Sequence, residues 1–104
     1  MINQVVPWLL KLLDSSSGDI VISAAEALGQ LGAGQATERL IELLGDHRSG
    51  VRRAAVRALG RLRARGAVEP LKRIAVEDES DYVQVAAQAA VILIQADLQN
   101  AHKT

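Results

Sequence analysis

The chain has 104 residues, and its 12 basic and 12 acidic side chains cancel. This balance excludes a general electrostatic attraction to nucleic acids or membranes, and the absence of cysteine excludes disulfide bonds and thiolate chemistry. Apolar residues make up 49% of the chain and are almost entirely Ala, Val, Leu and Ile. A core of these residues suits close helix packing in a single domain rather than a large cavity for a ligand.

The N-terminal third predicts two helices joined by a polar turn. Apolar side chains recur at the spacing of one helix face at Val5, Val6, Leu9, Leu10, Leu12 and Leu13. Pro7 falls in the first turn of this helix, where its missing amide hydrogen is not needed. The polar segment 14–19 offers N-cap residues for a second helix over about 20–31, and the glycines of segment 32–34 end that helix.

The middle and C-terminal thirds follow the same plan. The middle third predicts helices over about 37–44 and 51–64, separated by a polar turn. In the last third, Pro70 lies in the opening turn of a helix. An acidic loop follows at 77–81, and a long final helix is expected over about 82–98.

The order of the apolar residues repeats along the chain. Leu12-Leu13 and Ala27-Leu28-Gly29 return 31 residues later as Leu43-Leu44 and Ala58-Leu59-Gly60. A weaker third copy comprises Leu71, Ile74, Val83, Ala86, Ala87, Ala90 and Val91. A period of this length with two helices per unit is typical of a stacked-helix solenoid, in which each unit buries its apolar face against its neighbour. We therefore expect one domain of three repeats, with boundaries at about 2–33, 34–64 and 65–99.

Two glycines lie inside the helical patterns. Gly29 and Gly60 each cost about 1 kcal/mol relative to alanine at such a position. Close approach of a neighbouring backbone would offset this cost, and the alanines around both glycines keep the helix surface low. We therefore predict a tight helix–helix contact at each glycine.

The middle repeat carries a family resemblance. The stretch from Asp46 to Gly60, which contains Val51-Arg52-Arg53-Ala54-Ala55, resembles the HEAT-like repeats named after phycobilisome lyases. Ala67-Val68-Glu69-Pro70-Leu71 is similar to the opening of another such repeat. The resemblance implies an all-α, right-handed, armadillo-like α-solenoid of three HEAT-like two-helix repeats, with six helices. Its second helices would line a concave face that binds another macromolecule.

The resemblance also implies polar contacts between repeats. In this family, a loop Asp and the Arg that follows a Val often form a ladder from one repeat to the next. Asp46 and Arg52 match both positions. The first repeat has Ser15 and Val21 at these positions, and the third has Asp78 and Gln84.

Arginines gather in the middle repeat, at Arg48, Arg52, Arg53, Arg57, Arg61, Arg63 and Arg65. With Val51, Ala55 and Leu59 buried, Arg53 and Arg57 project from the opposite, concave side of the helix. Arginine offers a planar fork of donors to a carboxylate or phosphate group. We predict a concave surface that binds an acidic segment of a protein partner and consists of Arg52, Arg53, Arg57 and Arg61, with Ile22 and Glu26 from the first repeat. The alternative is a solvated surface whose arginines pair with nearby carboxylates.

The last predicted helix differs from its counterpart in the middle repeat. Where the middle repeat has Arg53, Arg57, Gly60 and Arg61, the third has Val85, Ala89, Ile92 and Leu93. Contiguous exposed apolar residues usually mark an interface, so these four positions predict partner docking or a homo-oligomer. Alternatively, the helix rotates and closes its own core.

The sequence shows no recognisable catalytic or metal-binding group. His47 and His102 lack carboxylates at ligand spacing, and the acidic loop lacks the pattern of a calcium loop. We therefore expect a non-enzymatic, cytoplasmic binding or scaffolding module without a metal, a cofactor or a membrane segment. Two other functions stay open: an accessory subunit in bilin chromophore attachment, which the resemblance implies, and a weak nucleic-acid-binding module.

Overall fold

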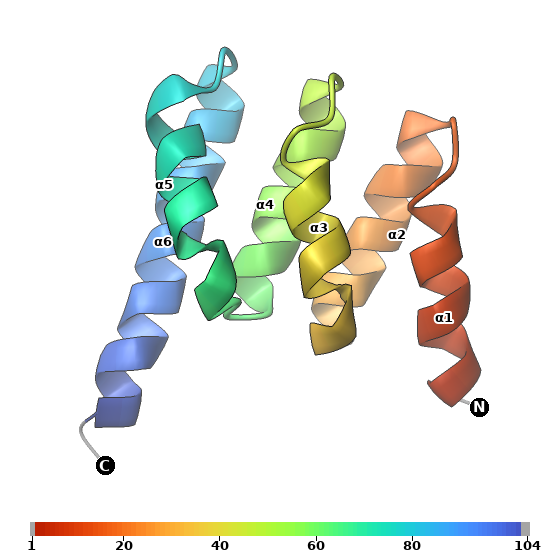
Figure 1. The fold of residues 1–104 in the computed structure, drawn as a ribbon, viewed down its shortest axis with the longest axis horizontal. Helices are drawn as coiled ribbons and strands as arrows, with labels where there is room; N and C mark the ends of the chain where they lie inside the picture. Colours follow the sequence, from red (N-terminus) through yellow and green to blue (C-terminus); the bar gives the residue numbers. More distant parts are fainter. Residues whose placement is uncertain (1, 103–104) are drawn as a thin grey trace.

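The computed structural model describes residues 2–102, and side chains are described for residues 4–101. The described residues form helices and turns and contain no β-strand. Six α-helices follow one another as three hairpins (Figure 1): α1 (Ile2–Leu12) with α2 (Gly18–Gln30), α3 (Thr37–Leu43) with α4 (Ser49–Arg61), and α5 (Val68–Glu77) with α6 (Asp81–His102). Short 3₁₀-helices, η1 (Gly34–Ala36) and η2 (Arg65–Ala67), lead into the second and third hairpins. The predicted all-α stack of six helices is confirmed.

The hairpins stack into two layers that measure 38 × 36 × 16 Å along the principal axes. The second helices form the tighter layer, in which α2 packs on α4 and α4 packs on α6. The first helices contact mainly the second helices and make few contacts with one another. The stack therefore curves toward α2, α4 and α6, which form its concave side, whereas α1, α3 and α5 form the convex side.

Equivalent positions in successive repeats supply the core. Leu9, Leu40 and Leu71 occupy the same place in the three first helices, and all three are buried. Leu28 and Leu59 do the same in α2 and α4. Burying a side chain of this size contributes about 1.5–3 kcal/mol, so the contacts between repeats stabilise helices that are too short to persist alone.

The predicted close approach at both glycines is confirmed. A Cβ atom added to Gly29 would lie 3.0 Å from the Cα atom of Ala58, and one added to Gly60 would lie 3.1 Å from the Cβ atom of Ala90. Both distances are shorter than ordinary van der Waals contact, so a larger residue forces the second helices apart. Glycine facing alanine is therefore what lets α2, α4 and α6 pack closely.

The ends of α2 and α4 share one backbone conformation with different residues. Gly32 follows α2 with a φ of 66°, and Arg63 holds the equivalent place after α4 with a φ of 53°. Positive φ is natural for glycine at a helix C-terminus but strained for arginine. The Arg63 guanidinium donates a hydrogen bond of 2.6 Å to the carbonyl of Gly60, which also accepts one from the backbone amide of Arg63.

Helix α6 is longer than the sequence pattern predicted. It continues to His102 instead of ending near residue 98, and its last turns project beyond the neighbouring helices (Figure 1). No glycine or proline follows Leu98, and the residues that do follow tolerate a helix, so nothing local stops it. A search of the described residues finds no helix with the length and hydropathy needed to span a bilayer.

Candidate functional site

The concave side presents three parallel rows of side chains. Each row consists of residues four apart on one second helix, so that neighbours in a row are separated by about 6 Å along the helix axis. The rows are Ile22, Glu26 and Gln30 on α2, Arg53, Arg57 and Arg61 on α4, and Val85, Ala89 and Leu93 on α6. The middle row is therefore basic, and the row beside it on α6 is apolar.

A groove of about 640 Å³ runs between these last two rows. One wall consists of Arg53, Arg57 and Arg61, and the other consists of Tyr82, Val85, Ala89 and Leu93. Gly60 and Ala90 also line the groove, where α4 and α6 approach most closely. The structure thus joins three of the predicted arginines and most of the predicted apolar interface into a single site, which we call the α4–α6 groove.

The arginines of this wall are available to a ligand. Arg53, Arg57 and Arg61 are exposed, and their side chains make no hydrogen bond or ion pair with any residue in the described part of the chain. The nearby carboxylates do not pair with these arginines in the structure. Asp46 binds Arg48, Asp78 binds Arg52, and Glu26 makes no ion pair within the described residues.

Arg52 is not part of the exposed surface, contrary to the sequence prediction. Only 6% of this residue is accessible to solvent. Its Nε and Nη2 atoms donate hydrogen bonds of 2.9 and 3.0 Å to the carboxylate of Asp78, and its Nη1 atom donates to the carbonyl of Asp46. Arg52 points toward the next repeat because it lies one position, about 100°, from the concave row. It holds repeats together rather than binding a ligand.

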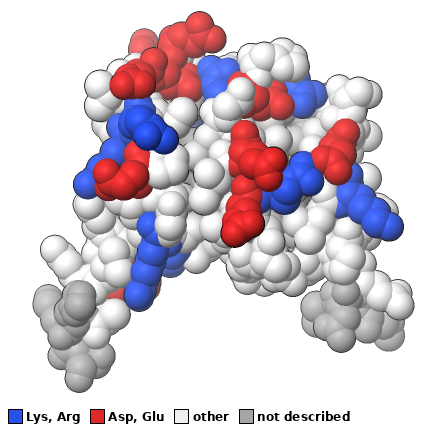
Figure 2. Space-filling model, viewed as in Figure 1, with Lys and Arg blue, Asp and Glu red and all other residues white. Residues whose placement is uncertain are grey.

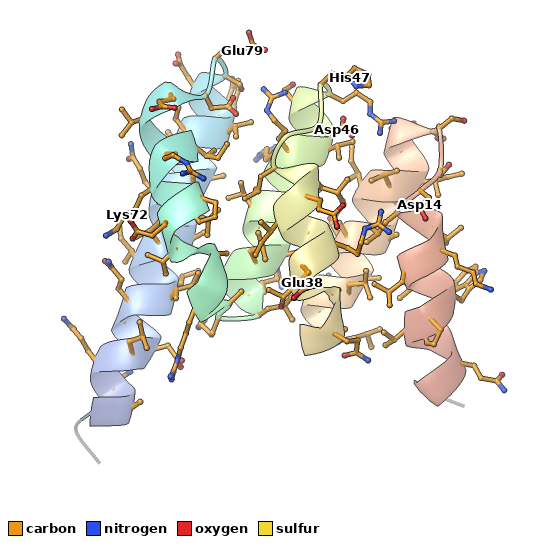
Figure 3. The ribbon with its side chains drawn as sticks, viewed as in Figure 1. Asp14, Glu38, Asp46, His47, Lys72 and Glu79 are labelled. Carbon is orange, nitrogen blue, oxygen red and sulfur yellow. The ribbon has the colours of Figure 1, made fainter. Side chains whose placement is uncertain are left out.

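The turns between first and second helices carry the other polar contacts. Asp46, in the turn after α3 (Figure 3), accepts hydrogen bonds of 2.9 and 3.0 Å from Arg48, and these lower the pKa of its carboxyl from 3.8 to about 2. Arg48 in turn donates to the carbonyl of Ser16 in the preceding repeat. Hydrogen bonds from Arg52 likewise lower the pKa of Asp78. The polar ladder implied by the resemblance is thus present between the second and third repeats, while Arg48 makes the link to the first.

Three other predicted site residues lie at the margin of the groove or outside it. Ile22 is half-buried because its Cδ1 atom lies against Gly50 of the next repeat. Glu26 is exposed and lies near Arg57 and Arg61, across a small hollow between α2 and α4. Ile92 is exposed but does not line the groove, so it belongs to a different surface from Val85, Ala89 and Leu93.

Among the lining residues that the sequence prediction missed are Tyr82 and Arg63. Tyr82 lies at the start of α6, and its ring is largely exposed on the apolar side. Its spacing of seven and eleven residues from Ala89 and Leu93 places it on the same helix face, a signal present in the sequence. Arg63 also lines the groove, but its position depends on the positive φ after α4, which arginine does not predict.

The convex side offers a second, chemically different hollow. A space of about 780 Å³ separates α3 from α5, and its lining combines Ile41 and Ile74 with charges of both signs, including Glu42 and Arg73. Figure 2, which views the molecule from this side, shows basic and acidic side chains interspersed. Carboxylates outnumber arginines in this lining, but both signs are present, whereas the charged residues that line the α4–α6 groove are all arginines.

Helical hairpins stacked through equivalent residues, with second helices on a concave side, define an α-solenoid. A family model described as HEAT repeats matches residues 6–92. The chain therefore belongs to the HEAT repeat family, whose members are commonly protein-interaction scaffolds. A search of curated proteins finds no match to the chain.

Proposed function

We propose that this protein is a non-enzymatic binding module whose α4–α6 groove holds an acidic, partly apolar segment of another protein. The observation that carries the proposal is the unpaired row of Arg53, Arg57 and Arg61 facing the apolar row of α6 across one groove. A ligand that satisfies both walls has acidic side chains along one edge and apolar side chains along the other. The same requirement disfavours a purely acidic segment, which would leave the α6 wall uncovered.

The two walls make different contributions to binding. An exposed arginine–carboxylate pair contributes about 0.2–1 kcal/mol, whereas full burial of a side chain such as Val85 or Leu93 contributes about 1.5–3 kcal/mol. Most of the affinity therefore comes from the α6 wall. The arginines select the sign of the ligand's charge and fix its orientation, because charges across an interface govern specificity more than affinity.

Peptide selection tests this division directly. Random peptides displayed on phage are selected on the wild-type protein and on the Arg53→Glu/Arg57→Glu variant. We expect wild-type selection to enrich peptides that combine Asp or Glu with large apolar residues. Selection on the variant should retain the apolar residues and replace the acidic ones by Lys or Arg.

A matched control separates the groove from general charge. The Lys72→Glu/Arg73→Glu variant has the same change in net charge, but on α5 (Figure 3), and should select the same peptides as the wild type. Acidic peptides that bind the Arg53→Glu/Arg57→Glu variant with unchanged affinity would contradict the proposal. So would an oligonucleotide or a bilin that binds the groove more tightly than every selected peptide.

A further inference from the structure

The contacts between repeats inside the chain define what each end of the stack would contact. Each residue has a counterpart 31 or 32 positions further along the chain, in the next repeat. The side of α4 that contacts α6 therefore has its counterpart on the side of α6 that faces away from α4. Similarly, the surface that α4 presents to α2 recurs on α2. The two ends of this chain are therefore the two halves of a junction between repeats.

The N-terminal end face is an uncovered apolar surface. A hollow of about 460 Å³ lies between α1 and α2 and is lined mostly by apolar side chains: Trp8, Leu9, Leu12, Ile20, Ala24 and Ala27, with Asp19 and Ser23 at polar positions. In the next repeat, Val51 and Ala58 are the counterparts of Ile20 and Ala27, and both are buried by α2. Nothing within the described residues covers the N-terminal face, where Trp8 remains 60% exposed.

The C-terminal end face carries two exposed aliphatic side chains. Val76, at the end of α5, is 77% exposed, and Ile92, on α6, is 66% exposed. Ile92 holds the place of Gly60, and Gly60 contacts Ala90. If the stack continued into another copy, Ile92 would therefore face Ala27 of that copy.

The same equivalence pairs Val76 with a tryptophan. At the first junction in the chain, Asp14 forms an ion pair with Arg39 (Asp14 is labelled in Figure 3). Val76 holds the place of Asp14 in the third repeat, and Trp8 holds the place of Arg39 in the first. The ionic pair of the internal junction thus corresponds to an apolar pair, Val76 with Trp8, between the two end faces.

We infer that separate copies of this chain associate end to end, with the C-terminal face of one copy, at Val76 and Ile92, docked on the N-terminal face of the next, at Trp8 and Ala27. Because Ile92 stands where α4 has glycine, α6 of one copy lies farther from α2 of the other than a glycine would allow. The Ile92 side chain enters the hollow between α1 and α2 of the other copy. The contact continues the arrangement already present at both junctions within the chain. It does not depend on the α4–α6 groove or on any ligand.

Two glutamines add polar groups to the C-terminal face. Gln84 donates hydrogen bonds to the carbonyls of Val76 and Asp78, and Gln88 donates to the carbonyl of Ala75. These side chains give the C-terminal face a partly polar surface. An interface that mixes apolar contacts with polar groups is typical of reversible association.

Blocking one end at a time distinguishes this contact from a symmetric dimer. The Ala27→Glu variant blocks the N-terminal face, and the Ile92→Glu variant blocks the C-terminal face. Because the contact joins unlike faces, the wild type should form a series of oligomers as concentration rises, whereas each variant alone should be monomeric. Mixed together, the two variants should form a 1:1 heterodimer, since each keeps the face that the other lacks.

Sedimentation velocity measures the oligomeric state, and circular dichroism checks that each variant is folded. The control is the Gln30→Glu variant, which adds the same charge to α2 but on the concave row, and it should associate like the wild type. If Ala27→Glu unfolds, Trp8→Glu replaces it as the variant that blocks the N-terminal face. A wild type that stays monomeric at about 1 mM would overturn the inference. Association by either folded end variant alone, or a mixture of the folded end variants that remains monomeric, would also overturn it.

Discussion

Arg52 and Asp78 form a buried, two-point ion pair that joins α4 to the turn between α5 and α6. The Nε and Nη2 atoms of Arg52 donate to the two carboxylate oxygens of Asp78 at 2.9 and 3.0 Å. The third nitrogen of the guanidinium donates to the carbonyls of Asp46 and His47. One side chain thereby fixes the turn of its own repeat and the turn of the next, a task that lysine, with a single nitrogen, does not perform.

Breaking this pair should destabilise the fold strongly. The Asp78→Ala substitution leaves the buried guanidinium of Arg52 without its carboxylate, and loss of one partner of a buried ion pair costs about 3–5 kcal/mol. We expect the free energy of unfolding, measured by urea denaturation, to fall by about 3 kcal/mol. Asp14→Ala removes an exposed ion pair with Arg39 and should have little effect. Equal losses for the two variants would contradict the structure.

Stability should fall in acid for the same reason. Ion pairing lowers the pKa of Asp78 from 3.8, and that of Asp46 from 3.8 to about 2, so both carboxylates bind protons less readily in the folded chain than in the unfolded one. Their stabilising contribution is complete above the unfolded pKa and disappears as the pH falls through the folded value. We expect unfolding free energies from urea titrations to decrease between about pH 5 and pH 2. The Asp78→Asn variant should show a smaller decrease over this range.

The sequence was most informative where one local pattern recurs. The 31-residue period, the alanines around Gly29 and Gly60, and the glycine-rich turn after α2 predicted the helices and their closest contacts. These features are local or repeat at a fixed interval. The end of α6 was predicted less well because no residue after Leu98 marks a stop.

Substitution of a packing glycine should separate the second helices. In the Gly60→Leu variant, the new side chain meets Ala90, since even its Cβ atom would lie 3.1 Å from that of Ala90. Overpacking of this kind costs about 1–3 kcal/mol, more than the roughly 1 kcal/mol gained from better helix propensity. We expect a lower melting temperature. The control is Gly66→Leu, because a Cβ atom at Gly66 has no neighbour within 4 Å, and a loss at Gly66 as large as that at Gly60 would contradict the explanation.

Relief of the strain at Arg63 should stabilise the protein. The Arg63→Gly variant places a glycine after α4, as Gly32 stands after α2. It removes the cost of a positive φ, which is about 1–2 kcal/mol for a residue with a side chain. The lost hydrogen bond to Gly60 offsets about 0.5–1.5 kcal/mol of that gain. We expect a net increase of about 0.5 kcal/mol in unfolding free energy by thermal or urea denaturation. Arg63→Ala keeps the strain without the hydrogen bond, so it should be less stable than both.

The candidate site was only partly predictable. Helical spacing placed Arg53 and Arg57 on the concave side, but it did not show that Arg52, one residue away, turns toward Asp78, since that contact joins residues far apart in the sequence. Nor did it show that Val85, Ala89 and Leu93 face the arginines across one groove while Ile92 faces outward. Those distinctions depend on how the second helices are rotated against each other.

The central claim is that acidic, partly apolar protein segments bind between α4 and α6. The most direct measurement is a titration of the ¹⁵N-labelled protein with a peptide selected on the wild type, followed by two-dimensional NMR. We expect the largest shift changes at Arg53, Arg57, Val85, Ala89 and Leu93. In the Arg53→Glu/Arg57→Glu variant, the changes at Val85, Ala89 and Leu93 should need a higher concentration of the same peptide. Shift changes concentrated on the convex hollow around Ile41 and Ile74, or unchanged in that variant, would contradict the claim.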